Sequence, residues 1–375
     1  MKILITGGAG FIGQRLCAKL GAEGHQITVL DNFLPQVHGP DAERLFAAWF
    51  DGRIIRGDVR DRAAWHEALP QQDAVVHLAA ETGTGQSMYE VQRYESVNIA
   101  GTALLLDCLV NDPNRSVRKL VVASSRAIYG EGRYRCADHG LVYPLAREES
   151  DMKAGRFEPR CTHCRNFVSR ETTVEAAPFL PSSFYGLTKQ VQEQMVLMYA
   201  RVLQISGYAL RYQNVYGPGQ SLNNPYTGIL AVFSNLAREH RAIDIFEDGD
   251  ESRDFVYIDD VVAATAACLD PTRAGIHAIN VGSGVATTVA EVARAVVAQL
   301  GSSSALRISG AFRHGDIRHN VADLALARET LGYVPRTPFA EGLARFLDWA
   351  QASDIKDSGY EKSLQELRAK GLMHG

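Results

Sequence analysis

Short apolar runs alternate with amphipathic stretches over the first two hundred residues of the chain. Apolar runs at 2–6, 26–30, 53–57, 74–80 and 120–123, most of them bounded by glycine, aspartate or serine, are predicted to be buried strands. The stretches between them carry apolar residues at helical spacing, and no internal repeat or low-complexity linker interrupts the alternation. The pattern predicts an α/β protein with a doubly wound parallel sheet, whose sites lie at the carboxyl ends of the strands.

The pattern becomes more mixed beyond about residue 212. Long helices are expected over about 89–110 and 184–206, followed by a helix over about 228–239 and a strand at 243–246. This texture ends the regular alternation and predicts a second, smaller mixed α/β unit. The expected division is a first domain over 1–212 to which 254–272 returns, an insertion within it over 131–180, a smaller lobe over 213–253 and 273–350, and a C-terminal helical tail over 351–375.

A glycine-rich turn joins the first predicted strand to the first predicted helix. Gly7, Gly10 and Gly13 have the spacing G-x-x-G-x-x-G, in which the first two glycines let the backbone approach a pyrophosphate and the third permits close packing. The second strand is followed by Asp31, where a carboxylate would bind the adenosine ribose hydroxyls. No arginine adjoins Asp31 to receive a 2′-phosphate. The sequence therefore predicts dinucleotide binding and favours NAD over NADP.

Tyr185 and Lys189 lie four residues apart in the helix expected over 184–206, so their side chains share one helix face. An ammonium group beneath a phenol favours the phenolate and lowers a pKa that is normally about 10. The pair is a candidate general base and acid, although the same spacing also occurs in helices without chemistry. Ser125 follows the strand at 120–123, where its hydroxyl would orient a reacting oxygen or simply form a turn.

Two further strand ends supply candidate cofactor contacts. Asp58 and Val59 would hold the adenine, with a simple turn as the alternative. Small residues after the fourth strand would let a cofactor lie across its end, and His77 within that strand is interpreted as a buried structural histidine. The candidate cofactor-binding residues are Gly7, Gly10, Phe11, Ile12, Gly13, Asp31, Asn32, Asp58, Val59, Leu78, Ala79, Ala80, Asn98, Tyr185 and Lys189.

Charge and composition exclude several classes of protein. Lys and Arg number 39 against 43 for Asp and Glu, and this net charge of −4 offers no electrostatic surface for nucleic acid or an anionic membrane. No apolar run is long enough to span a bilayer, and the early glycine turn leaves no room for a signal peptide. We therefore expect a cytoplasmic protein without disulfides, in which Cys17, Cys108 and Cys268 are buried thiols.

In combination, these motifs resemble the extended short-chain dehydrogenase/reductases, specifically NAD-dependent sugar-nucleotide epimerases and dehydratases. The resemblance runs from Met1 to about Trp349 and is broken between Gly130 and Pro181. It implies a Rossmann lobe that holds NAD, a smaller lobe that holds a nucleoside-diphosphate sugar, and a homodimer formed through the two long helices. Five motifs carry it: TGGAGFIG at 6–13, HLAA at 77–80, Y-x-x-x-K at 185–189, NVYGP at 214–218 and RDFVY at 253–257.

The resemblance also implies a role for each site residue. Ser125 would hydrogen-bond the sugar hydroxyl, Tyr185 would remove its proton, and Lys189 would hold the nicotinamide ribose while hydride passes from sugar C4 to NAD. Asn214, Arg253 and Arg313 would meet the diphosphate. The predicted substrate-binding residues are Ser125, Arg126, Asn214, Arg253 and Arg313.

The residues after Ser125 distinguish among the activities of the family. Relatives that eliminate water carry an Asp-Glu pair directly after this serine or threonine, and several related dehydratases and decarboxylases keep at least the glutamate. Arg126 and Ala127 occupy these positions here and supply no carboxyl group. We therefore expect 4-epimerisation through a transient 4-keto sugar. The alternatives are a UDP-hexose or UDP-hexuronate 4-epimerase, a 4,6-dehydratase, and a non-enzymatic dinucleotide-sensing regulator, which would not need the Tyr/Lys pair.

The segment between Ser125 and Tyr185 is longer than the short loop usual in the family and contains two cysteine-bearing pairs. Cys136 and His139, and Cys161 and Cys164, each enclose two residues, which is the ligand spacing of a structural zinc site. A flexible loop with incidental thiols is the alternative. Four protein ligands leave no open position on the metal, so the zinc would be structural. We expect a metal-pinned flap over the sugar or a partner subunit.

Details of this segment modify the prediction. Gly140 suits the tight turn of a zinc knuckle, whereas Arg165 stands where a second glycine would be more usual. His163 is less suited than His139 to be a ligand, because it lies inside the second pair. With the stretch YQNVYGPGQ at 212–220, the segment makes the chain similar to a subset of the family, the dTDP-L-rhamnose 4-epimerases, which interconvert dTDP-L-rhamnose and dTDP-6-deoxy-L-talose.

Overall fold

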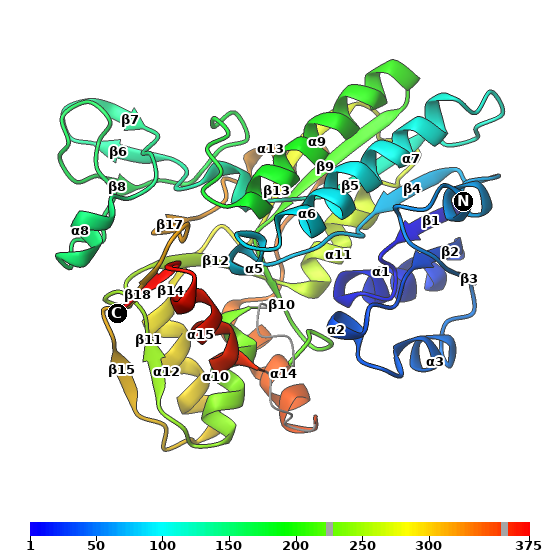
Figure 1. The fold of residues 1–375 in the computed structure, drawn as a ribbon. Helices are drawn as coiled ribbons and strands as arrows, with labels where there is room; N and C mark the ends of the chain where they lie inside the picture. Colours follow the sequence, from blue (N-terminus) through cyan, green and yellow to red (C-terminus); the bar gives the residue numbers. More distant parts are fainter. Residues whose placement is uncertain (223–227, 354–358) are drawn as a thin grey trace.

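The computed structural model describes residues 1–222, 228–353 and 359–375 (Figure 1). Parts of two expected regions, 223–227 of the smaller lobe and 354–358 of the tail, lie outside the described residues. Among the described residues, seven parallel strands form the main sheet, which confirms the expected fold class. In spatial order they are β13 (Ile276–Val281), β9 (Ser206–Tyr212), β5 (Lys119–Ser125), β4 (Ala74–His77), β1 (Lys2–Thr6), β2 (Gln26–Asp31) and β3 (Arg53–Arg56).

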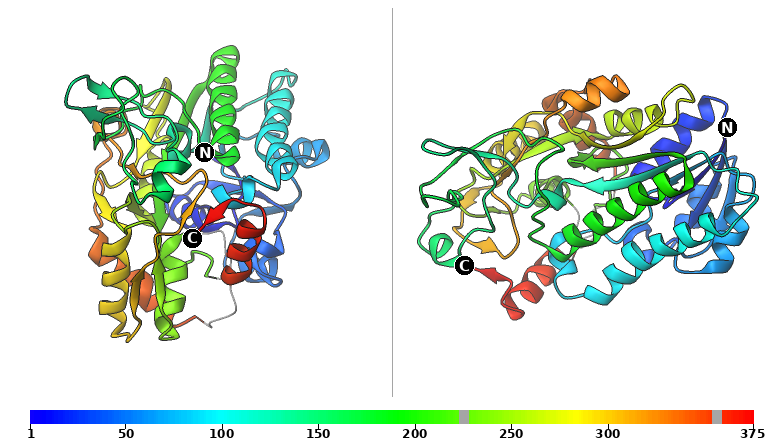
Figure 2. Two further views of the ribbon diagram at one scale, coloured as in Figure 1. Left: turned by 60° about the vertical axis from the view of Figure 1, so that its left-hand side comes forward. Right: turned by 90° about the horizontal axis from the view of Figure 1, so that it is seen from above.

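Helices bury both faces of this sheet (Figure 2). In β1, Ile3 and Ile5 enter the hydrophobic core on one face and Leu4 enters the core on the other, as the period of two in a strand requires. Because both faces are covered, strands of continuous apolar sequence are stable here. The first core contains α1 (Phe11–Ala22) and α11 (Ile258–Ala267), and the second contains α4 (Arg62–Ala68), α7 (Gly101–Val110) and α9 (Phe184–Leu203).

The helix expected over 89–110 is present but is not uniform. It consists of α6 (Val91–Tyr94), one π-helical turn, η1 (Glu95–Ala100), and then α7. It lies beside α9, the helix that carries Tyr185 and Lys189 (Figure 1). The wider π-helical turn places Asn98 deep in the protein, between the end of β4 and α9.

The smaller lobe is built around β12 (Ser252–Tyr257), which pairs with β10 (Asn214–Tyr216), β14 (Ala286–Thr288) and β17 (His319–Asn320). Two expected boundaries are wrong. Strand β13, assigned from sequence to the smaller lobe, joins the main sheet because it pairs with β9 along its whole length. Residues 254–257 stay in the smaller sheet as part of β12, whereas the following helix, α11, returns to the main sheet.

The insertion forms a small unit at the far left of Figure 1, with the three-stranded sheet β7-β6-β8 and a core of its own. The tail forms α15 (Tyr360–Ala369) and β18 (Met373–His374), which pairs with β16 (Phe312–Arg313). No helix in the described ranges is long and apolar enough to cross a membrane. The other elements are α2 (Pro35–His38), α3 (Ala42–Ala47), α5 (Thr84–Ser87), η2 (Arg126–Tyr129), β6 (Tyr134–Cys136), β7 (Gly140–Val142), α8 (Glu149–Lys153), β8 (Ser169–Arg170), α10 (Ile229–Arg238), β11 (Ile243–Ile245), α12 (Val289–Leu300), β15 (Leu306–Ile308), α13 (Ala325–Leu331) and α14 (Phe339–Gln351).

Candidate active site

The glycine turn after β1 brings backbone N–H groups to the edge of a cavity. Gly7 has a φ of +67°, and a Cβ there would lie 2.7 Å from the backbone nitrogen of Ala79. A Cβ on Gly13 would lie 2.5 Å from the carbonyl oxygen of Gly7, so the close packing expected of this glycine is present. Gly10 is the N-cap of α1 and provides no side-chain cap, which leaves this helix end suited to a pyrophosphate.

Asp31 lies at the end of β2 in the wall of the same cavity and is 5% exposed. Its carboxylate accepts hydrogen bonds from the backbone N–H groups of Ala9 (3.0 Å) and Phe33 (2.8 Å), which fix its orientation. His38 Nε2 lies 3.5 Å from the carboxylate, a neighbour that sequence reasoning missed because it belongs to the short helix α2. The helix end and the fixed carboxylate are the two groups that a dinucleotide needs at this place.

The cavity measures about 630 Å³ and extends from the glycine turn to the ends of β4 and β5. Near the expected adenine position, the Arg60 side chain hydrogen-bonds to Asp58 and lowers the pKa of this carboxyl group to about 2, and Asn32 donates a hydrogen bond of 3.1 Å to the same group. The structure thus brings together, in one wall, nearly all predicted cofactor-binding residues: Gly7, Gly10, Phe11, Ile12, Gly13, Asp31, Asn32, Asp58, Val59, Leu78, Ala79, Ala80, Tyr185 and Lys189.

Asn98 is the exception, and its placement corrects the prediction. It is fully buried behind the described wall, where its amide donates to the carbonyl of Glu81 (3.0 Å) and to the hydroxyl of Thr188 (2.9 Å). Its side-chain oxygen accepts the N–H of Glu81 at 2.8 Å. Asn98 therefore positions the chain after β4 against α9. His77 has a similar structural role, as expected, because both ring nitrogens contact buried threonine hydroxyls.

Tyr185 and Lys189 line the cavity on the same helix, but their electrostatics differ from the expectation. Lys189 Nζ donates to the carbonyl of Ala123 (2.8 Å) and to Gln192 Oε1 (2.7 Å), and burial lowers the pKa of this amine to about 7. Burial raises the pKa of the Tyr185 phenol, opposed by a hydrogen bond with Ser125 and by the charge of Arg126. The expected lowering of this pKa by Lys189 is therefore wrong, because burial dominates and the acting cation is Arg126.

Ser125 and Arg126 link the phenol to the smaller lobe. Ser125 Oγ accepts the N–H of Ala127 at 3.1 Å and caps the short helix η2, which directs its hydroxyl toward Tyr185. Arg126 Nε donates to Asn214 Oδ1 at 2.7 Å. Burial and the nearby Arg253 guanidinium lower the pKa of Arg126 to about 9. A cation therefore stands beside the phenol at the position where dehydratases of the resembled family carry a carboxylate.

A second cavity of about 230 Å³ shares Arg126 and Asn214 with the first. Arg253 and Arg313 stand in its wall, so the structure brings together all the residues predicted to meet a diphosphate. The Arg253 guanidinium donates to three backbone carbonyls at 2.8–3.0 Å and is thereby fixed in place. Arg313 pairs with Asp316 (2.8 Å), and its guanidinium lies 5.2 Å from the Phe246 ring centroid.

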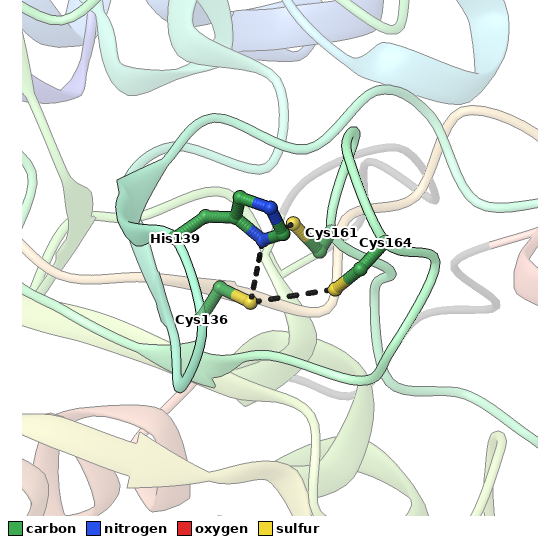
Figure 3. Close-up of side chains that lie close together, drawn as sticks. All are labelled: Cys136, His139, Cys161 and Cys164. Carbon is green, nitrogen blue, oxygen red and sulfur yellow. Dashed lines mark hydrogen bonds between the residues drawn. The ribbon is translucent and has the colours of Figure 1, made fainter.

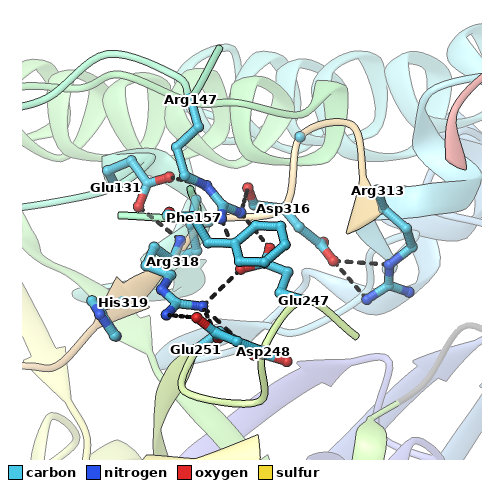
Figure 4. Close-up of polar contacts among 12 residues, drawn as sticks. Glu131, Arg147, Phe157, Glu247, Asp248, Glu251, Arg313, Asp316, Arg318 and His319 are labelled. Carbon is cyan, nitrogen blue, oxygen red and sulfur yellow. Dashed lines mark hydrogen bonds and ion pairs between the residues drawn. The ribbon is translucent and has the colours of Figure 1, made fainter. Parts of the chain in front are cut away.

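A buried ion cluster connects the insertion to this second cavity (Figure 4). Arg147 of the insertion pairs with Glu131 (3.1 Å) and with Glu247 (2.7 Å), which lies in the cavity wall. Arg318 pairs with Glu247 (2.9 Å), Asp248 (2.7 Å) and, from the insertion, Glu158 (2.7 Å). Sequence reasoning missed the pairing of Arg147 with Glu247, because nothing in their spacing indicates that they meet.

The described walls of the two cavities take no residue from 131–180. The ion cluster instead holds the insertion against the loops of the smaller lobe (Figure 4). In this structure the insertion therefore lies outside both cavities instead of over the sugar position, and the other alternative, a flap over a partner subunit, stays a prediction. The physical reason is that Arg147 of the insertion pairs with Glu247, and Glu131 and Glu158 bond to Arg318, so the insertion braces the second cavity from outside.

The predicted metal ligands converge within the insertion (Figure 3). Cys136 Sγ lies 3.6 Å from both His139 Nδ1 and Cys164 Sγ, and Cys161 Sγ lies 3.7 Å from His139 Nδ1. Ligands at tetrahedral zinc distances are separated by about 3.6–3.8 Å, so these three separations match a zinc site. All four ligand atoms lie within 4.8 Å of one another. Arg165 takes a φ of +66°, the left-handed backbone that the second knuckle needs.

A sequence model of the NAD dependent epimerase/dehydratase family matches residues 3–282. The chain belongs to this family. It is 40% identical over 360 residues to a dTDP-L-rhamnose 4-epimerase of Burkholderia thailandensis, covering 95% of this chain and 97% of the relative.

Two solved epimerase structures share the fold. The UDP-glucose 4-epimerase of Thermotoga maritima with UDP-glucose has a TM-score of 0.76 at 27% identity, covering 94% of this chain and 99% of that chain. The UDP-glucuronic acid 4-epimerase of Bacillus cereus, in complex with UDP-glucuronic acid and NAD, has a TM-score of 0.76 at 25% identity with the same coverage. The resemblance read from the five short motifs is thus confirmed over nearly the whole chain.

Proposed function

We propose that this protein is an NAD-dependent sugar-nucleotide 4-epimerase. The observation that carries the proposal is the group around the Tyr185 phenol, where Ser125 and Arg126 are its polar neighbours. Ala127 lies next to Arg126 and offers only a backbone N–H, already bonded to Ser125. Dehydration at sugar C6 needs a further acid and base, and these side chains supply neither. Reversible oxidation at C4 needs only one group that takes up a proton and returns it.

Each residue has a defined task in such a reaction. Ser125 would hold the C4 hydroxyl against Tyr185, whose phenolate would take its proton and later return it. Arg126 would stabilise the phenolate. Lys189, whose pKa is lowered to about 7, would bind the nicotinamide ribose as a hydrogen-bond donor. Bound NAD would supply the hydride acceptor that gives the hydride back to the other face of C4. The net result is inversion at C4 without net redox change.

We propose dTDP-L-rhamnose as the substrate and dTDP-6-deoxy-L-talose as the product. The likeness to a dTDP-L-rhamnose 4-epimerase at 40% identity over nearly both whole chains supports this choice. The alternatives are a UDP-hexose or UDP-hexuronate 4-epimerase, because the solved neighbours are UDP-glucose and UDP-glucuronic acid 4-epimerases. A sugar-nucleotide 4,6-dehydratase is disfavoured by Arg126 and Ala127, and a dinucleotide sensor by the intact Tyr185 site.

Incubation with dTDP-L-rhamnose, UDP-glucose and UDP-glucuronic acid, followed by NMR of the sugar ring, tests the proposal. A C4-inverted product supports it, and the substrate that turns over with the highest kcat/KM identifies the sugar. A stable 4-keto-6-deoxy product would establish a dehydratase, and no turnover of any sugar would favour the sensor.

A tyrosine substitution tests the assigned base. Tyr185→Phe is expected to abolish turnover while NAD stays bound, because only the proton carrier is lost. Tyr199→Phe on the same helix is the matched control and should leave turnover unchanged, since Tyr199 is not in the described cavity walls. Retained activity in Tyr185→Phe would refute the assignment.

We also propose that Cys136, His139, Cys161 and Cys164 hold a structural zinc ion. Their ligand atoms all lie within 4.8 Å of one another, and their thiols are not joined as disulfides. Protein purified without added metal should contain about one equivalent of zinc. A zinc content below about a tenth of an equivalent would contradict the proposed site. Cys136→Ser should lose the metal, whereas Cys108→Ser, outside the cluster, should keep it.

A homodimer is the proposed assembly, and the cytoplasm the proposed compartment. The helices α6, α7 and α9 carry exposed large apolar side chains, including Met198 (52% exposed) and Val202 (61%) on α9. Such side chains on neighbouring helices suit burial against a second copy. Light scattering of the unchanged protein should give twice the chain mass, whereas the double variant Met198→Glu, Val202→Glu should be a monomer. If the unchanged protein is itself a monomer, the proposed assembly is contradicted.

A further inference from the structure

The carboxyl-terminal helix α15 forms one wall of the second cavity. Tyr360, Ser363, Leu364 and Leu367 line it together with Arg126, Arg253 and Arg313. From sequence this segment is predicted only to be a helical tail, since a short polar helix beyond the family motifs carries no recognisable chemistry. In the structure, the buried residues Ser363 and Leu367 of α15 line a cavity that also contains the predicted diphosphate arginines.

The tail is fixed there by the smaller lobe. Strand β18 pairs antiparallel with β16, and the register puts Met373 opposite Arg313, one of the cavity arginines. Leu367 and Met373 are each 4% exposed and share a small core with Ala311. The backbone carrying Arg313 is therefore held in part by the last residues of the chain.

The larger lobe contacts the same helix from the other side of the cavity. The Tyr89 hydroxyl donates to Glu366 at 3.1 Å, and Lys370 Nζ lies 4.9 Å from the Tyr89 ring centroid. A Cβ on Gly85, in α5, would lie 3.6 Å from a methyl group of Leu367. Segment 359–375 thus spans the boundary between the two lobes, which Figure 1 shows with α15 in red.

The wall of this cavity combines charged and apolar surface. Arg126 and Arg313 provide positive charge for a diphosphate, in a wall that also contains the carboxylates of Glu247, Glu251 and Asp316. Leu364 and Leu367 of α15 provide apolar surface, together with Phe246, over whose ring the Arg313 guanidinium lies. A nucleoside diphosphate combines the same two kinds of group, a flat base and two phosphates. The cavity also shares Arg126 and Asn214 with the first, so one ligand can occupy both.

We propose that the inner face of α15, formed by Tyr360, Ser363, Leu364 and Leu367, belongs to the substrate-binding site and contacts the nucleoside of the sugar nucleotide. The inference rests on the proposed function for the kind of ligand. The family motifs provide Asn214 and Arg253 to this site, and the tail provides surface that lies outside those motifs. Substrate binding therefore depends on the seating of the tail, although the tail is remote in sequence from Tyr185.

Two substitutions of opposite sense test the proposal in the full-length, NAD-loaded protein. Ser363→Leu fills the cavity from the α15 side, and Leu364→Ala removes apolar surface from it. Each should raise the Kd for dTDP, or for UDP if that is the nucleotide bound, by about tenfold or more. Leu364→Ala loses a few buried methylene groups, which are worth about that factor, and Ser363→Leu puts a larger side chain into the space of the nucleoside. KM for the sugar nucleotide should rise in parallel while kcat and NAD content change little. Gln365→Ala, on the exposed side of the same helix, is the matched control.

Hydrogen exchange in the unchanged protein gives a measurement that does not depend on any variant folding correctly. Saturating nucleoside diphosphate should slow amide exchange across α15. If the nucleotide binds but leaves exchange in α15 unchanged, or binds both cavity variants as tightly as Gln365→Ala, the tail is not part of the site and the inference is overturned. If neither dTDP nor UDP binds the unchanged protein, the proposed function fails, and the inference fails with it.

Discussion

Replacing Arg147 by methionine tests whether the insertion supports the second cavity through buried charge. Arg147 is 3% exposed and stands between the carboxylates of Glu131 and Glu247, which are 2% and 4% exposed. Methionine keeps most of the side-chain volume but removes the cation, so both carboxylates lose their shared partner. Removing one member of a buried pair typically costs about 3–5 kcal/mol, because the remaining charge stays desolvated.

Contacts that survive the substitution place the expected cost near the lower end of this range, about 3 kcal/mol. Glu131 still accepts the N–H of Arg318 (2.8 Å) and the hydroxyl of Tyr134 (3.1 Å), and Glu247 still pairs with Arg318 (2.9 Å). A functional effect should accompany the loss. Glu247 has a φ of +49°, a backbone conformation that is unfavourable for a residue with a side chain, and it lies in the cavity wall. Releasing it should raise KM for the sugar nucleotide.

Chemical denaturation of the NAD-loaded protein measures the stability, and initial rates measure KM. Arg135→Met is the matched control, because Arg135 lies in the same insertion but is 55% exposed in its pair with Glu171, worth about 0–1 kcal/mol. Adding Glu247→Gln to Arg147→Met should restore part of the stability, since one of the two unpaired charges is then neutral. Equal losses for Arg147→Met and Arg135→Met would show that the buried cluster does not hold the insertion.

Two further substitutions probe buried polar groups. Burial and the nearby Glu247 raise the pKa of Glu251 from 4.5 to about 7, so Glu251 ionises at lower pH in the unfolded chain and lowers the stability of the folded protein as pH rises from about 4.5 to 7. The stability of Glu251→Gln relative to the unchanged protein should therefore increase by about 2 kcal/mol between pH 5.5 and 8. A difference that stays constant with pH would contradict the raised pKa. Asn98→Ala should cost about 1–3 kcal/mol in denaturation, because it leaves the Glu81 backbone and the Thr188 hydroxyl without their partner, and a loss below about 0.5 kcal/mol would refute that supporting role.

The sequence by itself determined the features that depend on local geometry. The glycine turn is readable because its steric demands involve neighbours in the chain, such as Gly13 against the Gly7 carbonyl. Tyr185 and Lys189 share a helix face because of their spacing alone. In the pairs Cys136/His139 and Cys161/Cys164, two intervening residues are few enough for both ligand atoms of a pair to reach one metal ion. Strand–helix alternation likewise predicts the parallel sheet, because apolar periodicity is a property of each segment.

Only the tertiary structure decided the features that depend on partners remote in the chain. An asparagine at position 98 could face a cofactor or bond to the backbone, and the sequence does not distinguish the two. In the structure, the π-helical turn directs the Asn98 side chain inward, to the backbone of Glu81. Arg147 looks like any loop arginine until Glu247 lies beside it, a hundred residues on. The Tyr185 pKa follows from burial, which spacing does not report. The polar helix at the end of the chain becomes a cavity wall because β18 pairs with β16, and no periodicity within α15 encodes that contact.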